Sequence, residues 1–342
     1  MNIYGTDGTD RLFGTDLSDL ICGFDGIDYL YGGPGEDGLL GGAGPDVLYG
    51  DTAYMHGPER DMALYWDSPV GVTVDLTTGT GRGGTAEGDT LIDIEGLRGS
   101  LYGDMLIGNA QANSLDGGSG NDFLIGRDGD DDLTGGFGDD TLTPGSGVDF
   151  VNGGPDNDTA DYSDSPAAVW ASLLFGGITG DAAGDTYVWI ENLSGSNHSD
   201  FLQGDNADNM LGGNQGSDWL WGEGGDDKLS GGRGTDTLAG GAGADTFIWR
   251  STNETRATDL ISDFEATLDL IDLQQIAADP KMLKDRPFEF IGMADFTAPG
   301  QVRWSIEGSE TVVWMNTDGD LDAEAAIRLA GAPLLGIDNF LL

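Results

Sequence analysis

Residues 195–248 read GSNHSDFLQ GDNADNMLG GNQGSDWLW GEGGDDKLS GGRGTDTLA GGAGADTFI, which are six consecutive nine-residue words. Each word opens with Gly, carries Asp or Asn at its sixth place and has a large apolar residue at its eighth place. Glycine permits the positive φ angles of tight turns. Side chains two residues apart on an extended segment point the same way, so we expect Asp227 to face the turn while Leu229 enters the core. The pattern predicts a solenoid of short strands joined by glycine turns.

Two more runs of words precede this one: residues 5–49 hold five and residues 99–161 hold seven. A carboxylate beside turn carbonyls forms an all-oxygen environment, which Ca²⁺ prefers. We therefore predict that the sixth-place residues bind calcium with the turn glycines around them. The sixth places are Asp10, Asp19, Asp28, Asp37, Asp46, Asp104, Asn113, Asp122, Asp131, Asp140, Asp149, Asp158, Asp200, Asn209, Asp218, Asp227, Asp236 and Asp245. The glycines singled out are Gly117, Gly118, Gly120, Gly231, Gly232, Gly234, Gly240, Gly241 and Gly243.

The composition favours a fold held together by metal. The formal net charge is -47, from 14 Lys+Arg against 61 Asp+Glu. Such a polyanion repels itself and does not bind nucleic acid or anionic lipid directly. One core residue in nine makes a thin core, and the single Cys22 excludes an internal disulfide. Calcium is therefore the expected stabiliser.

The N-terminus, MNIYGTDGTD, lacks the basic and apolar character of a signal peptide. No apolar run is long enough to span a membrane. Because the first word begins at Gly5, we expect no catalytic domain ahead of the repeats. Secretion, if it occurs, is expected to be directed from elsewhere in the chain.

Two inserts separate the runs, and the second copies the first. Ser165-Pro166 lies 97 residues after Ser68-Pro69, for example. Alternation of Val72, Val74 and Leu76 predicts a half-buried strand in the first insert, and Ile92 with Ile94 predicts another. The segment HGPERDMAL at 56–64 resembles a degraded word.

The last segment changes character, with fewer glycines and the alternating runs FEFIG, VRWSI and TVVWMN. It opens GGAGADTFIW, continues DLISDFEATLDLIDL and closes GIDNFLL. The nine-residue words resemble the RTX (haemolysin-type) calcium-binding repeat, and this segment resembles the C-terminal region of serralysin-type proteases. The resemblance implies a parallel β-roll with two words per turn and calcium between successive turns. It also implies a terminal cap that carries an uncleaved type I secretion signal. On that geometry the runs offer at most 3, 5 and 4 sites, about a dozen Ca²⁺ in all, and degraded words should lower this total.

The sequence contains few of the motifs that are typical of catalytic sites. The two histidines, His56 and His198, lack the HExxH context of a zinc protease, and no Gly-x-Ser-x-Gly elbow occurs. Glu95 and Glu191 recur beside aspartates, and a structural or calcium-binding role is favoured over a paired-carboxylate glycosidase. NTDGDLDAE at 316–324 is interpreted as a hairpin turn, with an extra calcium site as the alternative.

The sequence thus predicts an all-β fold: a parallel β-roll or β-helix solenoid with strand-rich inserts and a β-rich C-terminal capping module. The predicted parts are 1–50, run 1; 51–98, insert 1; 99–161, run 2; 162–194, insert 2; 195–248, run 3; and 249–342, the capping and secretion module. The predicted function is calcium binding in a secreted, non-catalytic protein that passes through a type I secretion apparatus. Its expected role is at a cell surface, in a matrix or in adhesion. The alternative is an enzyme that acts on extracellular polysaccharide, or an accessory carbohydrate-binding module, for which outward-facing tryptophans such as Trp219 and Trp221 would suit.

Overall fold

The computed structural model describes residues 1–51, 60–251, 254, 258–276, 287–318 and 320–342. The chain forms two compact units. The first contains Met1–Asp161 and Asp181–Ile190, and the second contains Tyr162–Gly180 and Glu191–Leu342. The described residues form strands and three short 3-10 helices, at Gly84–Ala86, Gly180–Ala182 and Ile337–Asn339. None of the helices in this part of the chain has the length and apolarity that crossing a membrane requires.

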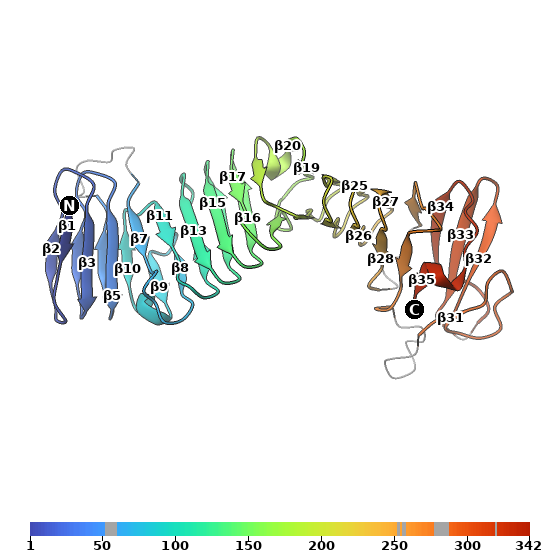
Figure 1. Ribbon diagram of the computed structural model, residues 1–342, viewed down its shortest axis with the longest axis horizontal. Coiled ribbons are helices and arrows are strands. Elements are labelled where there is room, and N and C mark those ends of the chain that lie inside the picture. The colour runs from blue at the N-terminus through green and yellow to red at the C-terminus, as the bar shows by residue number, and fades with distance from the viewer. Residues whose placement is uncertain (52–59, 252–253, 255–257, 277–286, 319) are drawn as a thin grey trace. The chain divides into compact units, whose positions relative to one another are not determined.

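The first unit consists of two sheets whose strands follow one another as successive rungs (Figure 1). In order across the first sheet, the strands are β1 (Asn2–Tyr4), β3 (Leu20–Asp25), β5 (Gly38–Ala43), β7 (Met62–Leu64), β11 (Gly96–Arg98), β13 (Ser114–Ser119), β15 (Asp132–Phe137), β17 (Phe150–Asn152) and β21 (Thr186–Val188). In order across the second, they are β2 (Arg11–Phe13), β4 (Tyr29–Tyr31), β6 (Val47–Tyr49), β10 (Thr90–Ile92), β9 (Thr80–Arg82), β8 (Thr73–Asp75), β12 (Met105–Ile107), β14 (Phe123–Asp128), β16 (Thr141–Ser146) and β18 (Thr159–Asp161).

The second unit repeats the arrangement. One row contains β22 (Asn192–Ser194), β24 (Met210–Gly212), β26 (Lys228–Ser230), β28 (Thr246–Ile248), β30 (Leu270–Asp272) and β35 (Phe340–Leu341). The other contains β20 (Gly176–Thr179), β19 (Trp170–Ser172), β23 (Phe201–Gln203), β25 (Trp219–Gly224), β27 (Thr237–Ala242), β29 (Asp259–Ile261), β34 (Ala325–Ala330), β33 (Glu310–Asn316), β32 (Gln301–Glu307) and β31 (Glu289–Phe290).

Two words make one turn of the solenoid. Parallel pairing joins Leu20 to Gly38 in the first sheet and Phe123 to Thr141 in the second, so partners lie 18 residues apart. Consecutive words therefore contribute to opposite sheets. This confirms the predicted β-roll.

The core is the line of eighth-place side chains that both sheets send inward. Leu30, Leu39 and Leu229 are fully buried, whereas Leu12 in the first turn is only half-buried. Trp219 and Trp221 flank the fully buried Leu220 and are 53% and 38% exposed, as their positions in the word predict. A single apolar side chain per word leaves the remaining interior to polar groups.

The first insert does not interrupt the two sheets of the first unit. β7 pairs with β5 and with β11, so Met62 lies between Gly38 and Gly96. The sequence separations of these pairs exceed the 18 residues of one regular turn. β9 lies antiparallel between β8 and β10. The predicted strand around Val74 is present as β8. The second predicted strand is present only in part, because β10 ends at Ile92, which is half-buried while Leu91 is buried, and Ile94 is buried but lies outside the strand. Residues 52–59, which include His56 and part of the degraded word, lie outside the described residues. The division of the chain into six parts stays a prediction.

The C-terminal module closes both rows of the second unit. β34 joins β29 and is followed by the antiparallel strands β33 and β32, while β35 pairs with β30 through Phe340 and Ile271. This arrangement covers strand edges that would otherwise expose unpaired backbone groups. The predicted capping role is therefore seen in the fold.

Candidate calcium sites

The sixth-place residues form ladders of hydrogen bonds from turn to turn. The backbone N–H of Asp10 donates to Oδ1 of Asp28 at 2.8 Å, and the N–H of Asp28 donates to Oδ1 of Asp46 at 2.8 Å. The same bond joins Asp122 to Asp140 and Asp218 to Asp236. In these words one carboxylate oxygen of the sixth residue thus holds neighbouring turns together.

Hydrogen bonds from within the same word to the side chain of the sixth residue divide the eighteen words into two classes. In six words, which we call capped words, the backbone N–H of the second residue donates to the side chain of the sixth residue. The Thr15 N–H to Asp19 Oδ2 distance is 2.6 Å, and the Ser196 N–H to Asp200 Oδ2 distance is also 2.6 Å. The sixth places of the capped words are Asp10, Asp19, Asp104, Asn113, Asp200 and Asn209. These are the first two words of each run, so every run begins with one capped turn.

In the other twelve words, which we call open words, the second residue has a positive φ angle. These second residues are Phe24, Gly33, Gly42, Gly118, Arg127, Gly136, Gly145, Gly154, Asn214, Glu223, Gly232 and Gly241. The N–H of Gly33 and that of Gly136 donate instead to the carbonyl of the first residue of the next turn. The carboxylate therefore loses the donor that a capped word supplies.

The consequence is a row of buried carboxylate oxygens without a donor. In eleven open words Oδ2 of the sixth residue is buried and accepts no hydrogen bond. These residues are Asp28, Asp37, Asp46, Asp122, Asp131, Asp140, Asp149, Asp218, Asp227, Asp236 and Asp245. A buried charged group without a partner is costly, and a set this regular fits the binding of cations along the row.

The first residue of the word leaves room beside this oxygen. A Cβ on Gly32 would lie 2.6 Å from Oδ2 of Asp37 and 2.9 Å from the carbonyl oxygen of Gly50 in the next turn. A Cβ on Gly117, Gly231 or Gly240 would also lie closer than 3.0 Å to the carboxylate of its own word. The other selected glycines, Gly118, Gly120, Gly232, Gly234, Gly241 and Gly243, all have positive φ. Carboxylate and carbonyl oxygens thus meet where no side chain intrudes, a donor set that fits Ca²⁺.

Burial raises the pKa of these carboxyl groups and so makes them weaker acids. Burial, followed by the charges of Asp185 and Asp131, raises the pKa of Asp149 to about 8. Burial also raises the pKa of Asp218 to about 8 and that of Asp227 to about 7, with further contributions from neighbouring carboxylates. A divalent cation beside these groups would favour their ionised form.

The nonapeptide register missed several residues that continue the ladders. Asp61, Asp89, Asp185, Asp259 and Asp269 accept the backbone N–H of Asp37, Asp46, Asp149, Asp236 and Asp245, respectively. A sequence signal exists, since Asp89, Asp259 and Asp269 each stand two residues before a buried apolar side chain. Protein donors cap three of them: the Tyr65 hydroxyl bonds Asp89, the Trp249 indole bonds Asp259, and the Glu265 N–H bonds Asp269.

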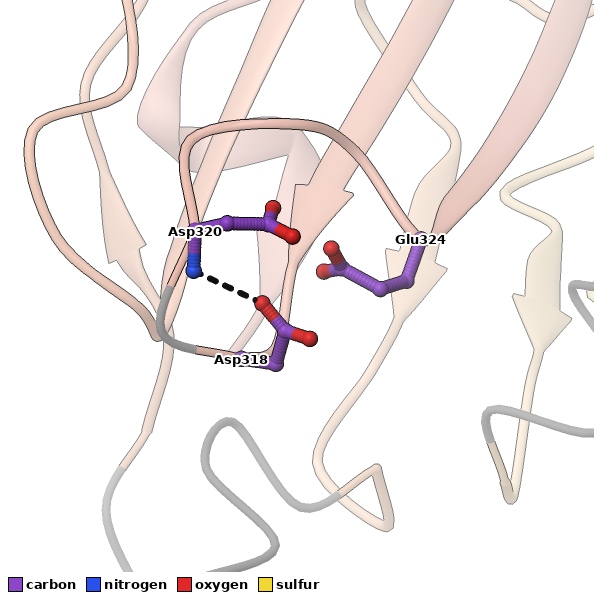
Figure 2. Close-up of side chains that lie close together, drawn as sticks. All are labelled: Asp318, Asp320 and Glu324. Carbon is purple, nitrogen blue, oxygen red and sulfur yellow. Dashed lines mark hydrogen bonds between the residues drawn. The ribbon is translucent and has the colours of Figure 1, made fainter.

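A separate acidic group lies in the C-terminal module. Asp318, Asp320 and Glu324 bring carboxylate oxygens within 4.8 Å of one another between β33 and β34 (Figure 2). The Asp320 N–H donates to Asp318, and the Thr317 N–H donates to Glu324. The predicted hairpin connection is present, although Gly319 lies outside the described residues.

His198 lies in a capped turn, where its N–H donates to the Ser196 hydroxyl at 3.0 Å.

Comparisons with known proteins agree with this geometry. The model of the RTX calcium-binding nonapeptide repeat matches residues 4–39 and 31–52. A calcium-binding RTX β-roll is the class that the fold and the site define. The model of the peptidase M10 serralysin C-terminal region matches residues 85–341, and the chain belongs to that family.

Solved structures also show similarity to the chain. The AlgE6R3 subunit of the Azotobacter vinelandii mannuronan C5-epimerase is 26% identical, with 42% of this chain and 78% of that chain covered and a TM-score of 0.31. The AlgE6R2 subunit is 23% identical, with 55% and 92% covered and a TM-score of 0.31. The extracellular lipase LipA from Serratia marcescens is 17% identical, with 97% and 40% covered and a TM-score of 0.30. No curated protein matches the chain.

Proposed function

We propose that the open words bind the calcium ions, each through Oδ2 of its sixth-place aspartate together with neighbouring turn carbonyls. The observation that carries the proposal is the row of eleven buried Oδ2 atoms without donors. The runs hold three, five and four open words, the same numbers as the limit expected from sequence. The capped words, including those of Asp10, Asn113 and Asn209, would close the start of each run without an ion of their own.

We expect Asp227→Asn to lower the calcium stoichiometry by one ion. Asparagine keeps the oxygen that accepts the Asn209 N–H, but loses the charge beside the turn carbonyls. At calcium a hundredfold above Kd the lost site should cost about 2.7 kcal/mol of stability. Native mass spectrometry and calcium-dependent thermal unfolding measure both effects.

Two controls isolate this effect. Asp226→Asn removes the same charge next in sequence, where the side chain accepts the Ala244 N–H and lies outside the ladder. Asp200→Asn changes a capped word. Both are expected to keep the wild-type number of ions, and equal losses in all three variants would contradict the assignment of open and capped words.

The proposed biological role is that of a secreted, non-catalytic protein at a cell surface, in a matrix or in adhesion, exported unfolded by a type I apparatus. Families of RTX repeats and serralysin C-terminal regions are typical of proteins exported in this way, and both match here. The non-catalytic role rests on the sequence, which has neither HExxH nor Gly-x-Ser-x-Gly. Degradation of extracellular polysaccharide by the purified calcium-loaded protein would favour the enzymatic alternative instead.

We expect removal of about the last sixty residues to abolish export from a host that carries a type I exporter. The address is expected in the segment that ends Asp338-Asn339-Phe340-Leu341-Leu342. Deletion of the first two words, 5–22, leaves that segment intact and should preserve export. The fraction of protein in the medium measures the effect, and efficient export of the C-terminal truncation would refute the route.

A further inference from the structure

Asp61 occupies a sixth place although it belongs to the first insert and to no intact word. Its side chain is 1% exposed, and its Oδ1 accepts the backbone N–H of Asp37 at 2.8 Å. Asp61 is the sixth residue of the degraded word 56–64, but it follows Asp37 by 24 residues rather than 18 and so lies outside the register of the intact run. The pairing of Gly38 with Met62 places Asp61 on the next turn of the same ladder.

The second oxygen of Asp61 is in the state found in open words. Oδ2 is buried and accepts no hydrogen bond. A Cβ on Gly50 would lie 2.6 Å from this oxygen and would also meet the carbonyl oxygen of Asp93. Gly50 and the Asp93 carbonyl thus stand in the places that Gly32 and the Gly50 carbonyl hold one turn earlier, around Asp37.

Other carboxylates converge on the same place. Oε2 of Glu95 accepts the Asp61 N–H at 3.1 Å, and so stands where a sixth-place aspartate would stand in the following turn. The charges that act on Asp61 are those of Asp37, Glu95 and Asp51, all carboxylates. The site therefore combines a buried oxygen without a donor, a carbonyl oxygen and additional negative charge, the donor chemistry of a calcium site.

Asp89, in the same insert, shows the opposite arrangement. Its Oδ1 accepts the Asp46 N–H at 2.8 Å, but the Tyr65 hydroxyl donates to its Oδ2 at 3.2 Å. The side chain is 2% exposed, so burial alone does not distinguish it from Asp61. The two residues differ in that Oδ2 of Asp89 accepts a hydrogen bond from a protein donor, whereas Oδ2 of Asp61 accepts none.

We infer that Asp61, Glu95 and the Asp93 carbonyl form an additional calcium site within the first insert, outside the nonapeptide words. The inference rests on the proposed function, because it applies to Asp61 the criterion that defines an open word. The row of ions on this side then continues past Gly50 instead of ending with the first run. The insert becomes part of the metal-dependent structure.

The test compares Asp61→Asn with Asp89→Asn in the full chain by native mass spectrometry in calcium. Asparagine preserves an oxygen that can accept the N–H of the preceding turn, and Asn113 and Asn209 already occupy sixth places whose own backbone N–H groups donate to the following turn. We expect Asp61→Asn to bind one ion fewer than the wild type, and Asp89→Asn to bind the wild-type number. Circular dichroism in calcium checks that both variants fold.

Glu95→Gln provides a second variant that leaves Asp61 in place. It is expected to lose the same single ion at calcium concentrations that saturate the words, with at least a tenfold weaker affinity at that site. If the wild type binds calcium while Asp61→Asn and Glu95→Gln both keep its stoichiometry, the inference is wrong and the proposed function stands. A wild type that binds no calcium would refute the proposed function itself.

Discussion

Removal of calcium by EDTA near neutral pH is expected to convert the protein from strand to coil. Without the ion, eleven buried carboxylates would each hold an oxygen that no donor satisfies, and each leaves an expensive buried charge. Binding at a hundredfold excess over Kd contributes about 2.7 kcal/mol per site. Five such sites already match the whole stability of an ordinary domain, about 5–15 kcal/mol.

Far-UV circular dichroism measures this transition. EDTA should give a coil spectrum, and millimolar calcium should restore the strand spectrum with a cooperative dependence on concentration, because each open word lies against the next turn. Magnesium at equal concentration is the matched control, since it prefers a rigid octahedron and keeps its waters. A strand spectrum unaffected by chelation would contradict the prediction.

Acidification is expected to act in opposite directions with and without calcium. In the calcium-free fold, burial raises the pKa of Asp46, Asp122 and Asp140 to about 7 and that of Asp149 to about 8, from the usual 3.8. The fold therefore binds more protons than the unfolded chain. Its stability is greatest below the unfolded value and is lost as pH rises from about 4 to about 8.

In EDTA, the strand signal should therefore increase when pH falls from about 8 to about 5. In calcium, protons compete with the ion for the same oxygens, so the half-saturating calcium concentration should rise over that interval. Two titrations by circular dichroism at several pH values provide both measurements. Loss of strand signal on acidification in EDTA would show that protonation does not relieve the buried charges.

The repeat architecture was predictable because each word carries its own information. The glycines set the turn, and residues such as Asp227 and Leu229 face inward together at every recurrence, so local spacing fixed both the strands and the core. The two-word turn and the cap formed by β35 followed from resemblance to a known family. Local order and family resemblance were enough for these features.

The distinction between open and capped words depends on a backbone angle that composition only partly reveals. Thr15 and Ser196 favour local hydrogen bonds, which agrees with their capped words. Phe24, Arg127 and Glu223, however, adopt positive φ without being glycine. For these three residues the sequence of the word gives no sign of the positive φ angle.

Asp61, in the degraded word 56–64, and Glu95, for which a structural or calcium-binding role was favoured, were not joined into one predicted site for a different reason. Their places in the ladder follow from pairings that span 24 and 34 residues, as between Gly38, Met62 and Gly96. Periodicity within a window of nine residues has no access to such separations. Only the pairing of strands across the insert brings these residues into one site.

The 18-residue translation between paired strands restricts how such a chain changes length in evolution. A duplicated or lost pair of words leaves every later strand in its sheet, as the pairing of Phe123 with Thr141 illustrates. A single word gained or lost would transfer all later strands to the opposite sheet and exchange their outer surfaces. Within an uninterrupted run, we therefore expect words to be gained or lost in pairs during evolution. Inserts are the places where a change by an odd number of words can be accommodated.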